Sequence, residues 1–327
     1  MNVLLTGATG FLGNNILREL NRRQTTVVAA IRHQTTPESL QGLDFLPVQA
    51  DLSNPESLQP GLFPKFDLCI HSAAMINIGW TRVDEARRIN VDATRRLAEI
   101  CLERSARMIL VSTVDTLACT KTPIVHSEND REPRCPDFCY PVTKREAEEA
   151  VLELLPSGLD VVIVQPGFIL GRWDWRPSSA EMLIAIARNG PPFAPGGGTN
   201  VVDVRDVVGG ILLAAEKGRS GESYILGGTN LSYFDFWSQM ANSVGVRHPK
   251  IRLPTWLAMT GGYVGDLWGK LRGSEGSLNS AAARMGQLYH YYSSAKAEQE
   301  LGYKARPIDE ALEQTIEWVR ERGWIKS

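Results

Sequence analysis

Short apolar runs alternate with longer amphipathic stretches along the first half of the chain. The apolar runs predict six strands, at Asn2–Thr6, Thr26–Ile31, Asp44–Val48, Leu68–Ser72, Arg107–Ser112 and Val161–Gln165. The stretches between them carry apolar residues at helical spacing and predict helices at Phe11–Arg22, near Pro55–Leu58, at Trp80–Arg104 and at Tyr140–Leu155. Strands separated by helices predict an α/β fold with a parallel, doubly wound sheet.

The pattern changes after Pro166. Residues 171–200 are rich in Trp, Pro and Gly, and we expect them to form irregular loops beside a binding site. Val201–Lys217 predicts a helix, Ser223–Leu226 a seventh strand, and Ile308–Arg322 a final amphipathic helix. We therefore expect two domains. A Rossmann-type domain would comprise residues 1–166 and about 201–228, and a smaller, mainly helical domain would comprise about 167–200 and 229–327.

Composition excludes several classes of protein. The 327 residues are 43% hydrophobic and 22% charged, which is ordinary for a globular protein with a large core. The net charge of −2 gives no overall attraction to nucleic acid, so we expect no nucleic-acid partner. The sequence contains neither an apolar run of about 18 residues nor a secretory leader, so we expect no transmembrane segment and a cytoplasmic protein.

Five cysteines are an odd number, and Cys135 and Cys139 are not at the spacing of a redox pair or a zinc knuckle. The five histidines are scattered singly and form no recognisable ligand set with them. We expect free thiols in a reducing compartment and no metal site.

A glycine-rich segment joins the first predicted strand to the first helix. It reads Thr6-Gly7-Ala8-Thr9-Gly10-Phe11-Leu12-Gly13. Glycines at this position permit a tight turn and a close approach of backbone N–H groups to a pyrophosphate, beside the positive end of the helix. The segment therefore predicts a dinucleotide site, with Gly7, Thr9, Gly10, Phe11, Leu12 and Gly13 as candidate contacts.

The end of the second strand indicates which dinucleotide is bound. It reads Ala30-Ile31-Arg32, with no Asp or Glu to accept hydrogen bonds from a ribose 2′-hydroxyl. Arg32 instead offers a guanidinium that suits a 2′-phosphate. The sequence favours NADP(H) over NAD(H).

Four further motifs follow in order: Asp51-Leu52, His71-Ser72-Ala73-Ala74, Asn90-Val91, and Tyr140 with Lys144. With the glycine segment, the chain resembles the extended short-chain dehydrogenase/reductase superfamily. Within it, the chain looks most like dihydroflavonol-4-reductase-like proteins and the bacterial hopanoid-associated sugar epimerase group. The resemblance implies that Asp51 and Leu52 lie near adenine, that Ala73 and Ala74 line the nicotinamide side, and that Asn90 shapes its helix and relays protons. Pro166 and Gly167 are further candidate cofactor contacts.

Tyr140 and Lys144 are spaced to lie on one helix face. We expect the lysine ammonium to lower the tyrosine pKa, so that Tyr140 acts as the acid in ketone reduction and as the base in alcohol oxidation. The resemblance also implies that Lys144 bonds the nicotinamide ribose. Thr113, at the end of the fifth strand, is the expected donor to the substrate oxygen, with Ser112 as the alternative.

Departures from the family pattern narrow the reaction. Val114-Asp115 stands where the dehydratases carry an Asp-Glu pair, and Thr199-Asn200 stands where epimerases usually carry an arginine that clamps a diphosphate. Arg172 or Arg176 could replace that arginine. The loops offer apolar and aromatic residues that suit an apolar carbonyl substrate: Ile76, Trp80, Phe168, Trp173 and Trp175.

The sequence thus favours an NADP(H)-dependent oxidoreductase that interconverts a ketone and a secondary alcohol of a small apolar or aromatic substrate. The alternatives are a sugar or nucleotide-sugar epimerase with tightly bound NAD(P), and a dinucleotide sensor with a degenerate site. Residues 254–267 are expected to be an ordinary packed helix, with a lid or an interfacial contact as alternatives. Family habit suggests a homodimer through the helices at 80–104 and 140–155.

Overall fold

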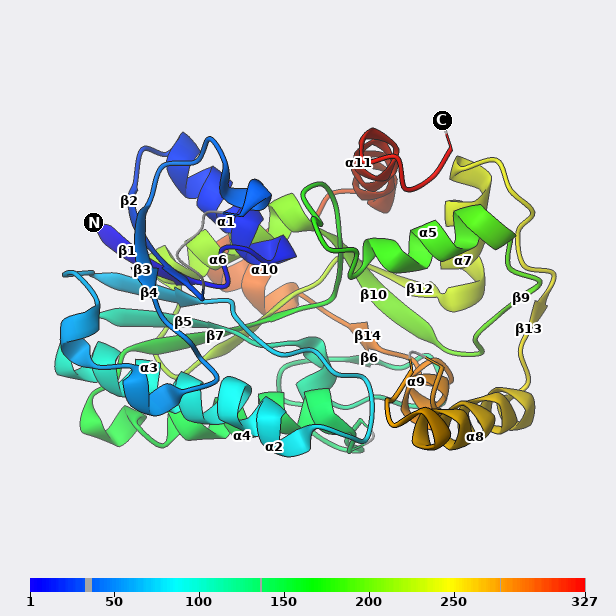
Figure 1. The fold of residues 1–327 in the computed structure, drawn as a ribbon, viewed down its shortest axis with the longest axis horizontal. Coiled ribbons are helices and arrows are strands. Elements are labelled where there is room, and N and C mark those ends of the chain that lie inside the picture. Colours follow the sequence, from blue (N-terminus) through cyan, green and yellow to red (C-terminus); the bar gives the residue numbers. More distant parts are fainter. Residues whose placement is uncertain (33–36, 136, 277, 327) are drawn as a thin grey trace.

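The computed structural model describes residues 1–32, 37–135, 137–276 and 278–326, and its centre is a seven-stranded parallel sheet (Figure 1). The strand order is β11-β7-β5-β4-β1-β2-β3. The strands are β1 (Asn2–Thr6), β2 (Thr26–Ile31), β3 (Leu46–Gln49), β4 (Leu68–His71), β5 (Arg107–Val111), β7 (Val161–Pro166) and β11 (Ser223–Leu226). This order is that of a doubly wound Rossmann sheet, as the sequence predicted.

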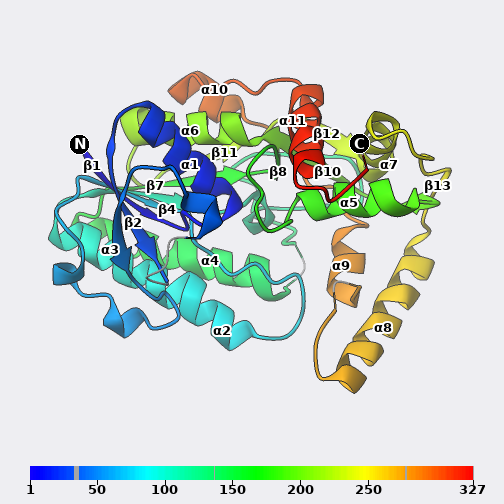
Figure 2. The same cartoon turned by 45° about the horizontal axis from the view of Figure 1, so that its top comes forward.

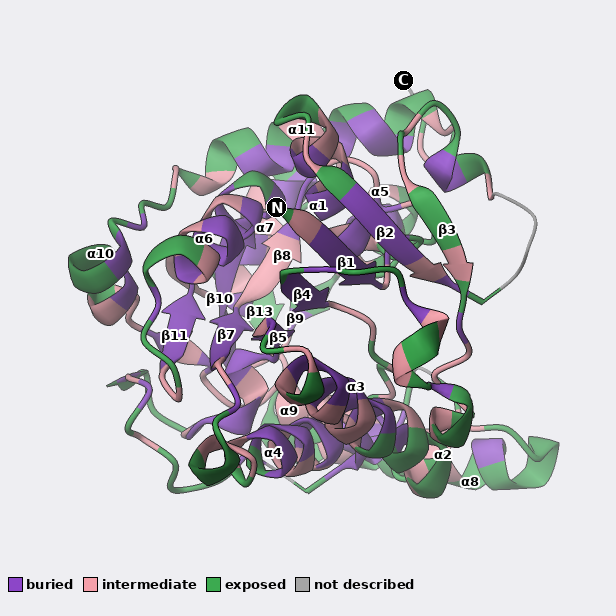
Figure 3. Cartoon of the chain, turned by 90° about the vertical axis from the view of Figure 1, so that its left-hand side faces the viewer, coloured by how far each residue is buried: buried purple, intermediate pink, exposed green. Residues whose placement is uncertain are grey.

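Helices cover both faces of the sheet. On one face lie α1 (Phe11–Arg22), α6 (Val204–Lys217) and α10 (Ala295–Leu301), and on the other lie α2 (Val83–Arg87), α3 (Ala93–Glu103) and α4 (Cys139–Leu152). Alternate residues of β1 pack into the hydrophobic cores on opposite faces of the sheet. Val3 and Leu5 pack on the side of α1 and α6, and Leu4 packs on the side of α3. Figure 3 shows the resulting band of buried strands between the two helical layers.

A second region is built on the three-stranded sheet β12-β10-β8. Its strands are β8 (Phe168–Leu170), β10 (Gly198–Asp203) and β12 (Thr229–Ser232), and its core helices are α5 (Ala180–Asn189), α7 (Tyr233–Ser243) and α11 (Ile308–Glu321). Two short pairs complete it: β9 (Phe193–Ala194) with β13 (Ile251–Arg252), and β6 (Val125–His126) with β14 (Tyr291–Tyr292). The helices α8 (Thr255–Arg272) and α9 (Ser280–Met285) form a hairpin that projects from this region (Figure 2).

Short helical turns connect several elements. The 3₁₀ turns are Glu38–Leu40, Pro55–Ser57, Pro60–Leu62, Val114–Thr116 and Leu155–Ser157, and a π-helical turn occupies Arg88–Asp92 between α2 and α3. Among the described residues, no helix is long and apolar enough to cross a membrane.

Four expectations about local structure were wrong. Residues 171–200 are not all irregular, because α5 forms there and buries Leu183, Ile184 and Ile186. Residues 201–203 continue β10 instead of starting a helix, since Asp203 caps α6 by accepting a hydrogen bond from Arg205 N–H. The helix expected at Trp80–Arg104 begins at Val83 and is interrupted by the π turn. The third strand starts at Leu46, two residues later than expected.

Candidate active site

The turn between β1 and α1 depends on two glycines. Gly7 has φ +78°, and a Cβ there would lie 2.7 Å from the Ala73 nitrogen. A Cβ on Gly13 would lie 2.1 Å from the Gly7 carbonyl oxygen, so any larger residue would push the helix away from the turn. The Gly10 N–H donates to the Gly7 carbonyl at 2.8 Å and closes the turn. Both positions therefore require glycine, because a Cβ at either one would collide with neighbouring backbone atoms.

The same turn fits a dinucleotide pyrophosphate. Gly10 is the N-cap of α1, and among the described residues no side chain caps this helix end. Thr9 and Gly10 are exposed, while Phe11 and Leu12 are half-buried in the first helical turn. Uncapped N–H groups at an exposed helix N-terminus form an anion site, so the backbone present here suits a phosphate.

The carboxyl ends of β2 and β3 bring Arg32 and Asp51 together. The Arg32 Nε lies 3.9 Å from Asp51 Oδ1, and both side chains are about half-exposed. Asp51 is held by its own loop, because Ser53 donates to its Oδ1 from both the backbone N–H and the hydroxyl. Leu52 is half-buried beside it. These residues form one edge of the region where the adenosine end of a dinucleotide would lie.

A buried hydrogen-bond chain connects the ends of β1 and β4. The Ala73 N–H donates to the Thr6 hydroxyl at 3.2 Å, and Thr6 Oγ1 lies 2.7 Å from His71 Nδ1. His71 Nε2 lies 2.8 Å from the Thr94 hydroxyl, which donates to the Asn90 carbonyl. Only a neutral imidazole with its proton on Nε2 satisfies every partner. Burial, together with the charge of Lys144, lowers the pKa of His71 to about 3, which is consistent with that neutral form.

Asn90 ties the loop after β4 to helix α4. Its Oδ1 accepts the Met75 N–H at 2.7 Å, and its Nδ2 donates to the Met75 carbonyl and to the Thr143 hydroxyl. Asn90 lies in the π turn, where the altered spacing directs its amide toward that loop. Its amide thus fixes Ala73 and Ala74 on one side and the helix of Tyr140 on the other.

Tyr140 and Lys144 share a face of α4, as their spacing predicted. Lys144 is buried and donates to the Val111 carbonyl at 2.7 Å. Burial lowers the pKa of Lys144 to about 8, while the nearby Glu148 carboxylate acts in the opposite direction. Burial and the charge of Asp115 raise the pKa of Tyr140, and a hydrogen bond with Thr113 partly offsets this. The expected lowering of that pKa by Lys144 is therefore wrong for the protein alone, since a carboxylate also faces the phenol.

The hydroxyls of Ser112 and Thr113, the two candidates from the sequence, have different surroundings. The Ser112 hydroxyl donates to Glu148 Oε1 at 2.5 Å inside the core. That oxygen also accepts from Thr116 and Gln165, so Ser112 belongs to a buried network. The Thr113 hydroxyl instead donates to Asp115 Oδ2 at 3.3 Å, accepts the Asp115 N–H at 3.2 Å, and acts on the pKa of Tyr140 through a hydrogen bond. Glu148, which sequence reasoning missed, thus separates the two candidates.

Pro166 and Gly167 lie at the end of β7, near the same edge of the sheet. Pro166 is buried, and the Gly167 N–H donates to the Leu226 carbonyl at 3.3 Å. A Cβ on Gly167 would lie 2.6 Å from both the backbone and side-chain oxygens of Asn200. Gly167 therefore permits close packing of β7 against β10, and nothing observed here assigns it a cofactor contact.

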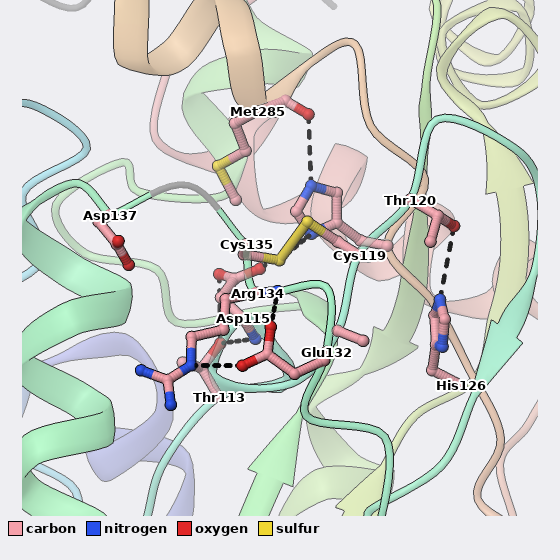
Figure 4. Close-up of a disulfide and its surroundings, with 12 residues drawn as sticks. Thr113, Asp115, Cys119, Thr120, His126, Glu132, Arg134, Cys135, Asp137 and Met285 are labelled. Carbon is pink, nitrogen blue, oxygen red and sulfur yellow. Dashed lines mark hydrogen bonds and ion pairs between the residues drawn. A yellow bond between two sulfur atoms is a disulfide. The ribbon is translucent and has the colours of Figure 1, made fainter.

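Two of the cysteines are not free thiols. Cys119 and Cys135 form a disulfide, whereas Cys69, Cys101 and Cys139 are free and buried. An antiparallel contact between Ala118 and Arg134 brings the two segments together, and the Cα atoms of the two bonded cysteines are 5.2 Å apart. Figure 4 shows the disulfide and its surroundings. This pairing could not be predicted from the sequence, because the two cysteines are 16 residues apart in a segment without a strand pattern.

His290 joins the disulfide to the catalytic edge. Its Nδ1 lies 3.9 Å from Cys135 Sγ and 3.2 Å from Asp115 Oδ1, while Nε2 lies 3.3 Å from the Met285 carbonyl. Cys119, Cys135 and His290 are close enough to one another to hold a metal ion, so the histidines are not all isolated from the cysteines. The sulfurs are bonded to each other, however, and thiolate is the form of cysteine that ligates a metal.

The aromatic residues after β8 pack differently from the expected pocket lining. The Trp173 and Trp175 rings stack on each other and against Trp318 of α11. Arg172 pairs with Glu317 and Glu321 of the same helix, at 3.1 and 2.5 Å. Interpreting these tryptophans as substrate contacts was wrong, because the aromatic cluster joins the loop to α11.

A Rossmann sheet with a glycine turn, a Tyr–Lys pair on one helix and a threonine at the adjacent strand end defines a class: an NAD(P)-dependent oxidoreductase of the extended short-chain dehydrogenase/reductase type. A model of the NAD dependent epimerase/dehydratase family matches residues 3–227. The chain belongs to this family.

Relatives cover nearly the whole chain. A protein of Synechocystis sp. strain PCC 6803, provisionally named dihydroflavonol 4-reductase, is 30% identical over 99% of this chain and 96% of its own. A Stigmatella aurantiaca protein named 4-hydroxy-2-methyl-3-oxo-4-farnesyl-3,4-dihydroquinoline-1-oxide ketoreductase is 29% identical over 99% and 97%. The crystal structure of the protein gox2253 superposes with a TM-score of 0.84 at 28% identity, covering 100% of this chain and 99% of that one.

Proposed function

We propose that the protein is an NADP(H)-dependent oxidoreductase that reduces a ketone of a small apolar or aromatic substrate to a secondary alcohol, and catalyses the reverse oxidation. The observation that carries the proposal is the pairing of Tyr140 with Thr113 at the carboxyl edge of the sheet. A hydrogen bond with Thr113 acts on the Tyr140 phenol, while burial and the charge of Asp115 raise the pKa of that phenol and keep it protonated. A protonated phenol beside a second hydroxyl is suited to receive a carbonyl oxygen.

The residues divide the reaction between them. A bound nicotinamide dinucleotide supplies the hydride to the carbonyl carbon. Thr113 and Tyr140 hold the carbonyl oxygen, and Tyr140 transfers its proton to that oxygen as the alcohol forms. Asp115 accepts from Thr113 and orients its hydroxyl, and the 3.3 Å length of that bond leaves the hydroxyl able to turn toward substrate. Lys144 and Asn90 position the helix and loop on which the site is built.

The preference for NADP(H) rests on Arg32. Its side chain lies beyond the end of β2, where the sequence has no carboxylate between Ala30 and Arg32. Its guanidinium is 65% exposed and can turn from Asp51, 3.9 Å away, toward a 2′-phosphate. Titration calorimetry with the wild type and Arg32→Asp is the direct comparison, with tighter NADPH binding expected in the wild type only.

The geometry gives less support to a nucleotide-sugar epimerase. Arg172, the arginine that could have clamped a diphosphate, is committed to Glu317 and Glu321. Asn200 is buried and donates to Asn230 Oδ1 at 2.7 Å, so it holds β10 to β12. Arg176, the other candidate, is exposed, and it makes no hydrogen bond or ion pair with any residue that the structure describes.

Two names among the relatives support a ketone substrate, since one is called a dihydroflavonol 4-reductase and another a farnesyl-quinoline ketoreductase. We further infer a homodimer through α3 and α4, as family habit suggests. Light scattering of the purified chain would report twice the mass of one 36.1 kDa chain.

The test is NADPH oxidation with a panel of apolar ketones: a dihydroflavonol, a 3-ketosteroid and an isoprenyl-substituted cyclic ketone. Tyr140→Phe should lower kcat/KM by at least about a hundredfold, because it removes the proton donor, while NADPH affinity stays close to wild type. Tyr289→Phe is the control, since that tyrosine packs against Tyr291. Full activity of Tyr140→Phe, or turnover of nucleotide sugars alone, would overturn the proposal.

A further inference from the structure

In helix α8, small residues face the protein and large apolar residues face solvent, which is the reverse of an ordinary packed helix. The face against the rest of the hairpin carries small residues: Ala258, Gly262, Gly265 and Gly269. A Cβ on Gly262 would lie 2.7 Å from Ser280 Cα, and one on Gly265 would lie 2.0 Å from the Leu278 carbonyl oxygen. The close approach of Ser274, Leu278 and Ser280 therefore fixes this small-residue face inward.

The outer face carries large apolar residues that contact solvent. Six of them are each more than half-exposed: Trp256, Tyr263, Val264, Leu267, Trp268 and Leu271. Their spacing of three and four residues places them on one stripe along the whole helix. The sequence predicted that this helix would pack as an ordinary core helix, and for this stripe the prediction is wrong. An exposed apolar stripe of this length indicates a binding surface.

Exposed basic residues flank the stripe along the chain at both of its ends. Lys270 and Arg272 are exposed at the end of α8, and Lys250 and Arg252 are exposed on the segment leading into it. The two nearby acids are engaged elsewhere. Asp266 accepts the Ser280 N–H, and Glu275 accepts hydrogen bonds from the Trp80 and Thr81 backbone.

The hairpin also contacts the loop that borders the candidate active site. Asn279 donates to the Ile78 carbonyl at 2.8 Å, and the Trp80 indole donates to the Ser280 hydroxyl at 2.9 Å. Ile76 and Leu278 are both more than 60% exposed on these adjoining segments. The same loop is fixed by Asn90 through Met75. Exposed apolar side chains thus lie on the hairpin and on the adjoining loop.

We propose that α8 docks the protein onto the surface of a lipid bilayer that contains anionic lipids. Tryptophan and tyrosine at the start, middle and end of the stripe suit the headgroup boundary, and basic residues suit anionic headgroups. Because apolar and aromatic side chains run along the whole helix, α8 lies in the plane of the surface. A second copy of the chain is a poorer partner, since burying Lys270 and Arg272 would require free carboxylates opposite them. The docking does not depend on the proposed reaction.

Co-sedimentation of the full chain with vesicles tests the proposal. Vesicles of equal parts phosphatidylcholine and phosphatidylglycerol should bind the wild type more tightly than phosphatidylcholine alone, and salt should weaken the binding. The double variant Leu267→Ser, Leu271→Ser should lose at least about tenfold in affinity. The control is Leu46→Ser, Ile124→Ser, which removes two similarly exposed residues elsewhere. Replacing Lys270 and Arg272 by glutamine should remove most of the salt dependence.

Two outcomes would overturn the proposal. The first is no binding to either vesicle at low salt, or equal loss in the test and control variants. The second is a dimer, measured by light scattering, that Leu267→Ser, Leu271→Ser dissociates while vesicle binding stays absent; it would assign the stripe to a second copy. Neither readout uses turnover, so failure of the proposed reaction leaves this test intact.

Discussion

Tyr140 has an environment that makes its phenolate costly to form. Burial and the carboxylate of Asp115 both favour the protonated phenol, and among the described residues Lys144 directs its ammonium to a backbone carbonyl instead. The protonated phenol is the form that donates in carbonyl reduction. With these charges around it, Tyr140 is therefore better suited to donate a proton than to accept one.

The pH dependence of reduction should follow Lys144. The pKa of Lys144 is lowered to about 8, so its ammonium is present below that pH and is lost above it, whereas the raised pKa of Tyr140 keeps the phenol protonated through this range. We expect kcat/KM to fall as the pH rises through about 8. Lys144→Arg keeps its charge to about pH 12 and should move this limb upward. An unchanged limb in Lys144→Arg would exclude Lys144 as its source.

The residues of this site were predictable to different degrees. The glycine turn, Tyr140, Lys144 and Thr113 follow from local spacing, because each lies where a strand passes into a helix or on one helical face. Glu148, Asp115 and His290 could not be found in this way. They reach the site through contacts between segments distant in sequence, and a single carboxylate or imidazole gives no local signal. The assigned roles of the cofactor-contact residues remain predictions.

Elements were predicted well where a hydrophobic period was uninterrupted. Six of the seven parallel strands and the helices α1, α4 and α11 match the expected positions closely, whereas β3 and α6 begin two and three residues later than expected. Helix α5 was missed because Gly and Pro flank a short apolar stretch, and its start is fixed by the buried Asp174 carboxylate, which accepts the Ser178 and Ala180 N–H groups. The π turn at Arg88–Asp92 has no sequence signature and is set by packing around Asn90.

The β1–α1 turn offers a test at the scale of one element. Gly13→Ala should unfold the turn locally and weaken NADPH binding at least about tenfold, because its Cβ would overlap the Gly7 carbonyl oxygen. Gly209→Ala is the matched control in helix α6, where nothing lies within 4 Å of the added Cβ. We expect that variant to bind normally and to gain about 1 kcal/mol in free energy of unfolding. Equal NADPH affinity in both variants, measured by calorimetry, would contradict the role of Gly13.

The whole molecule combines two cores that meet at the catalytic edge. The Rossmann core was expected, and so was a mainly helical second region, although its three-stranded sheet was not. The disulfide and the exposed stripe of α8 were also not expected, since both depend on how distant segments pack. The cytoplasmic location remains a prediction.

The disulfide should stabilise the folded molecule. It closes a loop across a sequence separation of 16 residues, and the chain-entropy model gives about 3 kcal/mol for a loop of this size. We expect reduction, or Cys119→Ser, to lower the free energy of unfolding by about that amount. Cys139→Ser is the control: it keeps the disulfide, so reductant should lower its free energy of unfolding as much as that of the wild type, whereas reductant should have little further effect on Cys119→Ser. Thiol titration of the unfolded, unreduced protein should count three thiols, and a count of five would show that the bond is absent.

The central claim is net transfer of hydride to a ketone with a proton from Tyr140. The most direct measurement uses NADPH carrying deuterium at the transferred position, with the ketone that the wild type consumes, and mass spectrometry of the product. We predict one deuterium on the alcohol carbon for each NADPH oxidised, and no labelled alcohol with Tyr140→Phe. An epimerised nucleotide sugar formed without NADPH consumption, or an alcohol free of deuterium, would contradict the account.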